Sequence, residues 1–230
     1  MQPVQAIDFG PYVTNLGTKK KDKLTCTGGE AFYASAKNDI LTNASFTVDE
    51  PNAPGGYLTY PSVMSGGAGN DTYQFKSDGW AFIADGGGGK DTVSFPRTSP
   101  FHPDYWYDDV IVNTVLINDR DLLISTTSLT DGGRANGIIL ADPFGKYSKG
   151  NKIEKVKFGK RSGSFKKFYK NLKKAAGSKK EWGDYYTFST STYEELAAAG
   201  ALDLSAFDDL SQLESGAYLD IAPYNNSLAI

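Results

Sequence analysis

Two short segments, residues 66–73 and 86–93, carry the same arrangement of glycine and aspartate. They read GGAGNDTY and GGGGKDTV, with glycine at the first, second and fourth positions, aspartate at the sixth and an apolar residue at the eighth. The glycines permit positive φ angles and leave the loop carbonyls uncovered. The aspartate adds a hard anionic oxygen, the kind of ligand that Ca²⁺ selects. The pattern therefore predicts calcium-binding loops.

One such loop cannot surround an ion, so we expect two loops, stacked one full turn apart, to share it. Asp71 and Asp91 are the natural pair of acidic ligands. The predicted metal-site residues of the two loops are Gly66, Gly67, Gly69, Asp71, Gly86, Gly87, Gly89 and Asp91.

A short strand pattern follows each loop. Tyr73 and Phe75 alternate with Thr72 and Gln74, and residues 91–95 repeat the alternation. Because successive side chains of a strand point to opposite faces, the apolar ones should fill a flat core between two parallel sheets. We therefore predict a mainly β fold, a parallel β-roll with capping strands and a small helical C-terminal region.

The paired motif resembles the calcium-binding nonapeptide repeat of the RTX (haemolysin-type) family. The resemblance is strongest in residues 65–95 and extends more weakly over residues 17–160, because residues 110–158 are similar to the strands that follow such repeats and cap the roll. It implies a protein that leaves Gram-negative cells unfolded, through a type I secretion channel, and folds when it meets calcium outside. The zinc-protease motif HExxH and the lipase motif GxSxG of RTX exoenzymes are both absent. We therefore expect a secreted structural, surface-associated or binding protein and no enzyme.

Residues 17–41 resemble worn copies of the same repeat. They keep Asp22 and Asp39, which are 17 residues apart, but most of the glycines are lost, so these two acids are predicted to be weaker ligands. Ala31 and Ala81 stand where acids of the opposite side would be expected. We therefore predict binding on one side of the roll only, with about one to three Ca²⁺ ions.

Two proline-rich segments interrupt the repeats. Residues 46–61 predict a protruding loop or a short hairpin, and residues 96–109 predict a solvated loop that caps the roll. The second segment contains Asp104, Asp108 and Asp109, which have the chemistry of general acids or bases, but no complementary element accompanies them. No catalytic residue is predicted, and the alternative function is an accessory module or an enzyme acting on an extracellular polysaccharide.

The composition of the chain argues against several other classes of protein and of site. The chain has 40% hydrophobic residues and a net charge of −3, which fits a globular protein and gives no indication of a nucleic-acid partner. The single Cys26 excludes an intramolecular disulfide, and the single His102 disfavours a zinc site or a catalytic triad. Residues 1–15 do not resemble a secretory signal, and no apolar run has the ~18 residues needed for a transmembrane segment.

Charge is strongly segregated near the C-terminus. Residues 146–180 contain fourteen Lys or Arg and one acid, whereas residues 181–230 contain nine acids and no Lys or Arg. Residues 164–176 predict a basic amphipathic helix, which either docks its apolar face on the domain or contacts an anionic cell surface or polysaccharide. The acidic tail resembles the signal read by the type I secretion apparatus. The predicted organisation is a roll over 1–160, the basic helix over 161–180 and the tail over 181–230.

Overall fold

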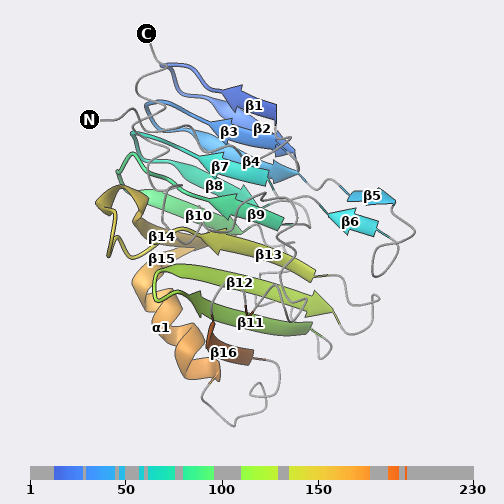
Figure 1. Cartoon of the computed structure of the whole chain (residues 1–230). Helices are drawn as coiled ribbons and strands as arrows, with labels where there is room; N and C mark the ends of the chain where they lie inside the picture. Colours follow the sequence, from blue (N-terminus) through green and yellow to red (C-terminus); the bar gives the residue numbers. More distant parts are fainter. Residues whose placement is uncertain are drawn as a thin grey trace.

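The computed structural model describes residues 13–27, 30–44, 47–49, 57–59, 62–75, 80–95, 110–128, 135–176, 186–191 and 195. These residues form an eight-stranded sheet, a six-stranded sheet, a two-stranded sheet and the helix α1 (Figure 1). The chain is therefore mostly β, and its two main sheets are mostly parallel. This agrees with the mainly β class predicted from the strand patterns.

The larger sheet has the strand order β1-β3-β7-β9-β13-β12-β11-β16. In that order its strands are Val13–Leu16, Glu30–Tyr33, Ser62–Ser65, Trp80–Ile83, Ala135–Leu140, Asp121–Ser128, Val110–Ile117 and Tyr186–Ser191. Its first five strands are parallel, whereas β12 is antiparallel to both of its neighbours. The sheet thus joins a parallel half to a β-meander.

The smaller sheet has the strand order β15-β14-β10-β8-β4-β2. In that order its strands are Arg161–Ser164, Ile153–Phe158, Asp91–Phe95, Thr72–Phe75, Ile40–Ala44 and Lys23–Thr27. All of its pairs are parallel except the edge hairpin of β14 and β15.

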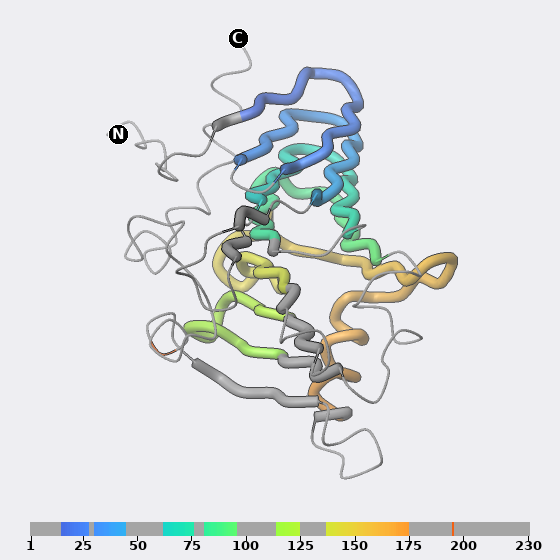
Figure 2. The backbone as a smooth tube through the Cα atoms, turned by 90° about the vertical axis from the view of Figure 1, so that its right-hand side faces the viewer, coloured from blue at the N-terminus to red at the C-terminus, as the bar shows by residue number. Residues whose placement is uncertain are grey.

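Consecutive strands alternate between the two sheets. From β1 to β4, and again from β7 to β10, each strand of the larger sheet is followed by one of the smaller sheet. The chain consequently winds in turns that lie one above another, which Figure 2 shows in blue to green. Every described connection from the larger to the smaller sheet falls at the same edge of this stack, and that geometry positions the candidate site.

The core fills the space between the sheets. On the smaller sheet, the predicted alternation places Tyr73, Phe75, Val93 and Phe95 inward, where all four are at most 1% exposed. The ring of Phe95 stacks between those of Phe75 and Phe158, at centroid distances of 5.4 and 5.1 Å. Burial of such side chains contributes roughly 1.5–3 kcal/mol each, so this row helps to hold the turns in register.

The first predicted interruption contains a hairpin. Strands β5 (Thr47–Asp49) and β6 (Tyr57–Thr59) pair antiparallel and project from the stack (Figure 1). Of the two structures predicted for residues 46–61, the short hairpin is therefore the one observed. The second interruption, residues 96–109, lies outside the described residues.

Helix α1 (Phe165–Ala176) docks on the part of the core formed by β14 and the segment before it, through Phe144 and Phe158. Its Phe165 and Leu172 are buried, and the ring of Phe168 lies 5.4 Å from that of Phe158. The apolar face predicted from the sequence is thus occupied by the domain itself. Its lysines are exposed, namely Lys166, Lys167, Lys170, Lys173 and Lys174.

Part of the predicted tail belongs to the larger sheet. Residues 186–191 form β16, which pairs in parallel with β11. Apart from Glu195, the chain after Ser191 lies outside the described residues. Within the described ranges, no helix has the length and apolar character that crossing a bilayer requires.

Candidate metal centre

Among the described residues, five connections run from the larger sheet to the smaller one and stack at one edge of the fold. In each case the loop leaves a strand of the larger sheet and enters the next strand of the smaller sheet. They are loop 1 (residues 17–22), loop 2 (34–39), loop 3 (66–71), loop 4 (84–90) and loop 5 (141–152).

Glycine is required where these loops touch. A Cβ on Gly69 would lie 1.6 Å from the carbonyl oxygen of Lys37 in loop 2, and a Cβ on Gly89 would lie 1.4 Å from that of Gly69. Both distances are far below van der Waals contact, so any side chain would push the loops apart. The structure places the other predicted glycines, Gly66, Gly67, Gly86 and Gly87, in the same two loops.

The acids at the ends of the loops form a continuous row, here called the acid ladder. The backbone N–H of Asp22 donates to Asp39 Oδ1 (2.7 Å), that of Asp39 to Asp71 Oδ1 (2.6 Å), and that of Asp71 to Asp91 Oδ1 (2.8 Å). The N–H of Asp91 donates to Glu154 Oε2 at 2.8 Å. All four predicted aspartates are thus brought together, and Glu154 extends the row although the sequence did not indicate it.

Three rungs of the ladder leave one oxygen without a partner. The Oδ2 atoms of Asp39, Asp71 and Asp91 are buried, and no donor of the described residues lies within hydrogen-bond distance of them. The side chains of Asp71 and Asp91 have no exposed surface at all. Since a buried charged oxygen without a partner is strongly unfavourable, these atoms are the ones that a bound cation would stabilise.

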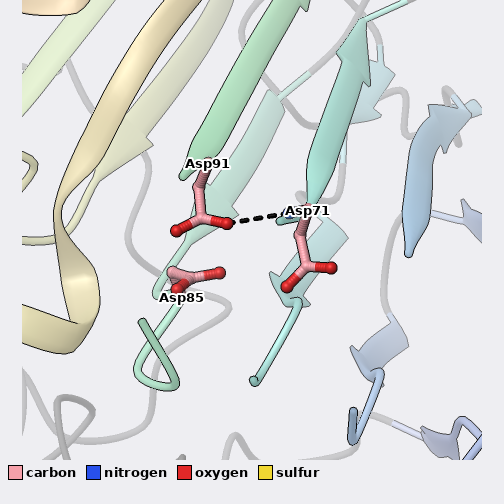
Figure 3. A group of neighbouring side chains, drawn as sticks. All are labelled: Asp71, Asp85 and Asp91. Carbon is pink, nitrogen blue, oxygen red and sulfur yellow. Dashed lines mark hydrogen bonds between the residues drawn. The ribbon is translucent and has the colours of Figure 1, made fainter. Parts of the chain in front are cut away.

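Asp85, in loop 4, adds a third carboxylate beside those of Asp71 and Asp91. One oxygen of each of the three lies within 4.8 Å of the others, and all three residues are buried (Figure 3). The Tyr73 hydroxyl donates to Asp85 Oδ1 and accepts the Gly66 N–H at 2.8 Å. Asp85 was missed because it precedes the repeat, although an acid directly before four glycines was a usable signal.

Burial and mutual repulsion disfavour the ionised forms of these acids. Burial first, and then the charges of Asp91 and Asp39, raise the pKa of Asp71 to about 7. Burial and the charge of Glu154 raise the pKa of Asp91 to about 6. Burial and the neighbouring carboxylates also raise the pKa of Asp85 well above its usual range. A cation among them would remove this cost.

The donor atoms at this centre are hard oxygens. Carboxylates and loop carbonyls suit Ca²⁺ at six to eight ligands, whereas zinc sites rely on imidazole or thiolate. Cys26 is buried in the core and burial raises the pKa of its thiol, and His102 lies outside the described residues. The residues present therefore fit a hard divalent cation.

Other buried acids of the described residues are satisfied by protein donors. Asp142 Oδ1 accepts the Lys146 N–H (2.8 Å), and its Oδ2 accepts those of Tyr147 (2.7 Å) and Ser148 (2.6 Å). Asp121 pairs with Arg120 at 3.1 Å. These acids hold loop 5 in place, which sets apart the three rungs whose oxygens lack donors.

The acids considered for catalysis lie outside the described residues; they are Asp104, Asp108 and Asp109.

Comparison of the chain with protein-family models and with curated proteins finds no match to either. The resemblance to the RTX family therefore rests on the sequence motif alone.

Proposed function

We propose that this chain is a secreted calcium-binding protein whose strands form a parallel β-roll of the RTX type. It folds on Ca²⁺ after type I export and acts as a structural, surface-associated or binding protein without catalysis of its own. The observation that carries the proposal is the buried trio of Asp71, Asp85 and Asp91 between two loops that match the RTX nonapeptide.

A cation is favoured at this centre by charge. Leaving a buried charge uncompensated costs several kcal/mol in a protein interior. No described cation lies in an ion pair with Asp71 or Asp91, and their Oδ2 atoms receive no hydrogen bond. A divalent ion supplies the missing charge, and the loops supply further carbonyl oxygens.

Calcium then acts as the folding trigger by mass action. An ion that binds only the folded state stabilises it by RT ln(1 + [L]/Kd), about 2.7 kcal/mol at 100 times Kd. The loop carboxylates repel one another when calcium is scarce, as in a cytosol, and are neutralised where it is abundant. The acidic C-terminal segment, which resembles a type I secretion signal, fits the same order of export and then folding.

The basic end of the domain is the proposed contact with an anionic cell surface or polysaccharide. Because the apolar face of α1 is docked on the core, its lysines are exposed, as are Lys155 and Lys157 of β14. Replacing Lys166, Lys167 and Lys170 by Glu should release the protein from washed cells. The control is the same change at Lys19, Lys20 and Lys21, an exposed run in loop 1. Equal retention of both triple variants contradicts the contact.

The calcium proposal is tested by circular dichroism and calorimetry with and without Ca²⁺. Wild-type protein should gain β structure and heat stability on adding millimolar Ca²⁺, and the variant Asp71→Asn/Asp91→Asn should not. Asp119→Asn is the control, because that acid is 73% exposed and its carboxylate pairs with the exposed Lys146, away from the acid ladder. A wild type that is fully folded and indifferent to Ca²⁺ contradicts the proposal.

The absence of catalysis is tested separately, on a panel of polysaccharides. Turnover that disappears when Asp104, Asp108 or Asp109 is replaced by Asn would establish the alternative, an enzyme acting on an extracellular polysaccharide.

A further inference from the structure

The larger sheet is apolar on both of its faces. In β9, Ala81 and Ile83 belong to the core between the two sheets, so Phe82 points to the outer face of the larger sheet. The same alternation places Ile139 of β13 and Leu123 of β12 on that outer face, because their neighbours in sequence belong to the core.

These outward side chains form one continuous row. They follow one another through the strand register from β3 to β11. In that order the row consists of Ala31, Val63, Phe82, Ile139, Leu123 and Val115, each of which is at most 6% exposed. At a strand spacing of about 4.8 Å the row is about 24 Å long. It is thus a second buried apolar surface.

The smaller sheet has the opposite kind of outer face. Its outward positions carry Thr72 and Gln74 on β8, and Thr92 and Ser94 on β10, all of them half-buried and polar. A sheet with one polar face packs on one side only, whereas a sheet that packs on both sides is apolar throughout. The larger sheet therefore has the composition of a middle layer.

The described helix and strands do not form the layer that covers this row. Helix α1 contributes Phe165 and Leu172 to the core between the sheets, and the β5–β6 hairpin projects from the stack (Figures 1 and 2). Because the row is already buried within one chain, its cover is a part of the same chain and not a second copy.

The C-terminal segment, residues 196–230, is the longest part of the chain beyond the described ranges. It follows β16, an edge strand that pairs with β11, and β11 carries Val115 at the end of the row. The next longest part, residues 96–109, is interrupted by three prolines and contains three aspartates, which suit a polar loop. Length and starting point therefore favour the C-terminal segment.

This segment contains an apolar stripe at helical spacing. Between residues 204 and 213 apolar residues recur at every third position, as on one face of a helix. They are Leu204, Phe207, Leu210 and Leu213. Asp208 and Gln212 fall on the opposite face. A helix of this length is about 15 Å long, enough to cover the part of the row nearest β16.

We propose that residues 204–213 form a helix whose apolar stripe covers the larger sheet at Ile139, Leu123 and Val115. The segment that resembles a type I secretion signal is then a layer of the folded domain. It is accessible to the export apparatus only in the unfolded chain, so folding conceals it. This consequence rests on the proposed function, whereas the packing of the helix on the sheet does not.

Hydrogen exchange of the full chain in Ca²⁺, followed by mass spectrometry, tests the cover. Phe207→Ser should speed exchange in β11, β12 and β13 about tenfold and leave β8 and β10 unchanged, because it uncovers the larger sheet alone. Gln212→Ser, on the opposite face of the stripe, is the control and should resemble the wild type. Exchange in β11–β13 that Phe207→Ser does not change overturns the proposal.

A double-mutant cycle tests the contact even where Phe207→Ser loosens the whole domain. The losses of unfolding free energy in Leu123→Ala and Phe207→Ala should not add in the double variant, because the two side chains pack together. The losses in Val93→Ala and Phe207→Ala should add, since Val93 faces the core between the sheets. Additive losses in both cycles overturn the cover.

Further outcomes separate this inference from the function on which its consequence rests. If Ca²⁺ slows exchange in the wild type and Phe207→Ser has no effect, the cover fails and the calcium function stands. If Phe207→Ser acts as expected in a protein that is indifferent to Ca²⁺, the calcium function fails and the cover stands. An antibody against residues 204–213 should bind the chain in urea and not the folded chain; equal binding overturns the concealment.

Discussion

Asp71 donates its backbone N–H to Oδ1 of Asp91, one turn further along the stack, at 2.8 Å. This bond fixes the orientation of the Asp91 carboxylate and leaves its Oδ2 atom buried without a partner. One oxygen of this rung therefore holds the turns together, and the other is the one that the proposed cation would bind. A substitution by Asn separates the two roles of the Asp91 side chain. Asn still accepts the hydrogen bond that holds the turns together, whereas the proposed cation requires the negative charge.

Replacing Asp91 by Asn should change stability in opposite directions with and without Ca²⁺. Asn keeps an oxygen that accepts the Asp71 N–H but removes a charge repelled by Asp71, Asp85 and Glu154. Calorimetry of the metal-stripped variant at about pH 8, above the pKa of about 7 for Asp71 and of about 6 for Asp91, should give a midpoint at or above that of the wild type. With millimolar Ca²⁺ the variant should melt below it. A variant that is less stable in both conditions would mean that the carboxylate is purely structural.

The metal-stripped protein should lose stability as pH rises. Unfolded aspartate has a pKa near 3.9, whereas the folded values are about 7 for Asp71 and about 6 for Asp91. The folded state thus binds protons more tightly, so its advantage is complete below about pH 4 and disappears as pH rises through 6 and 7. This pH dependence is measured by comparing the melting temperatures of the wild type and of Asp71→Asn/Asp91→Asn, both without metal, across the pH range. A difference that does not vary with pH contradicts it.

Calcium should reverse part of that dependence. Protons and Ca²⁺ compete for the same carboxylates, so affinity should fall as pH decreases below about 7. Titration calorimetry at several pH values should also show protons released on binding. A constant affinity between about pH 5 and pH 8 would place the ion elsewhere.

The repeat pattern predicted the acid ladder well because its physics is local. Asp71 and Asp91 follow glycine-rich loops and precede alternating strands, and the spacing of Asp22 and Asp39 placed them in the same row. Each of these signals lies within one turn of the chain, where backbone freedom and strand alternation are set.

Glu154 could not be found in this way. It lies 63 residues after Asp91 in the sequence, and it reaches the ladder only because β13 pairs with β9 and loop 5 then stacks on loop 4. The contact of loop 2 with loop 3 could not be predicted for another reason, since Lys37, at a φ of 82°, stands where loop 3 has Gly69, at a φ of 156°. Long-range pairing and tolerated strain leave no short-range pattern.

Gly89→Ala should destabilise the domain by about 3 kcal/mol, because overpacking against rigid backbone has few ways to relax. Its new Cβ would lie 1.4 Å from the Gly69 carbonyl oxygen. Gly163→Ala is the matched control, since a Cβ there meets nothing within 4 Å. Urea unfolding in Ca²⁺ should separate the two variants. Equal midpoints would mean that the loops do not stack this closely.

Phe165→Ala should cost about 3–5 kcal/mol. The side chain is 1% exposed, and its ring lies 5.9 Å from those of both Phe144 and Phe168, so its removal leaves a cavity where α1 meets loop 5. The neighbouring Lys166 is exposed, and Lys166→Ala should change stability by no more than about 0.5 kcal/mol. Similar unfolding curves for the two variants would show that α1 is not docked.

Tyr73→Phe should destabilise the protein by about 1–3 kcal/mol, because it leaves two buried groups without partners. The hydroxyl accepts the Gly66 N–H at 2.8 Å and donates to Asp85 Oδ1, and Tyr73 has no exposed surface. Unlike Asp91→Asn, this change removes no ligand charge, so the loss should appear with and without Ca²⁺. Tyr147→Phe, at a side chain that is 58% exposed, is the control in the same urea titrations. A loss of stability that appears only with Ca²⁺ would indicate that the Tyr73 hydroxyl takes part in coordinating the ion. No loss of stability in either state would mean that Asp85 does not depend on Tyr73 for its position.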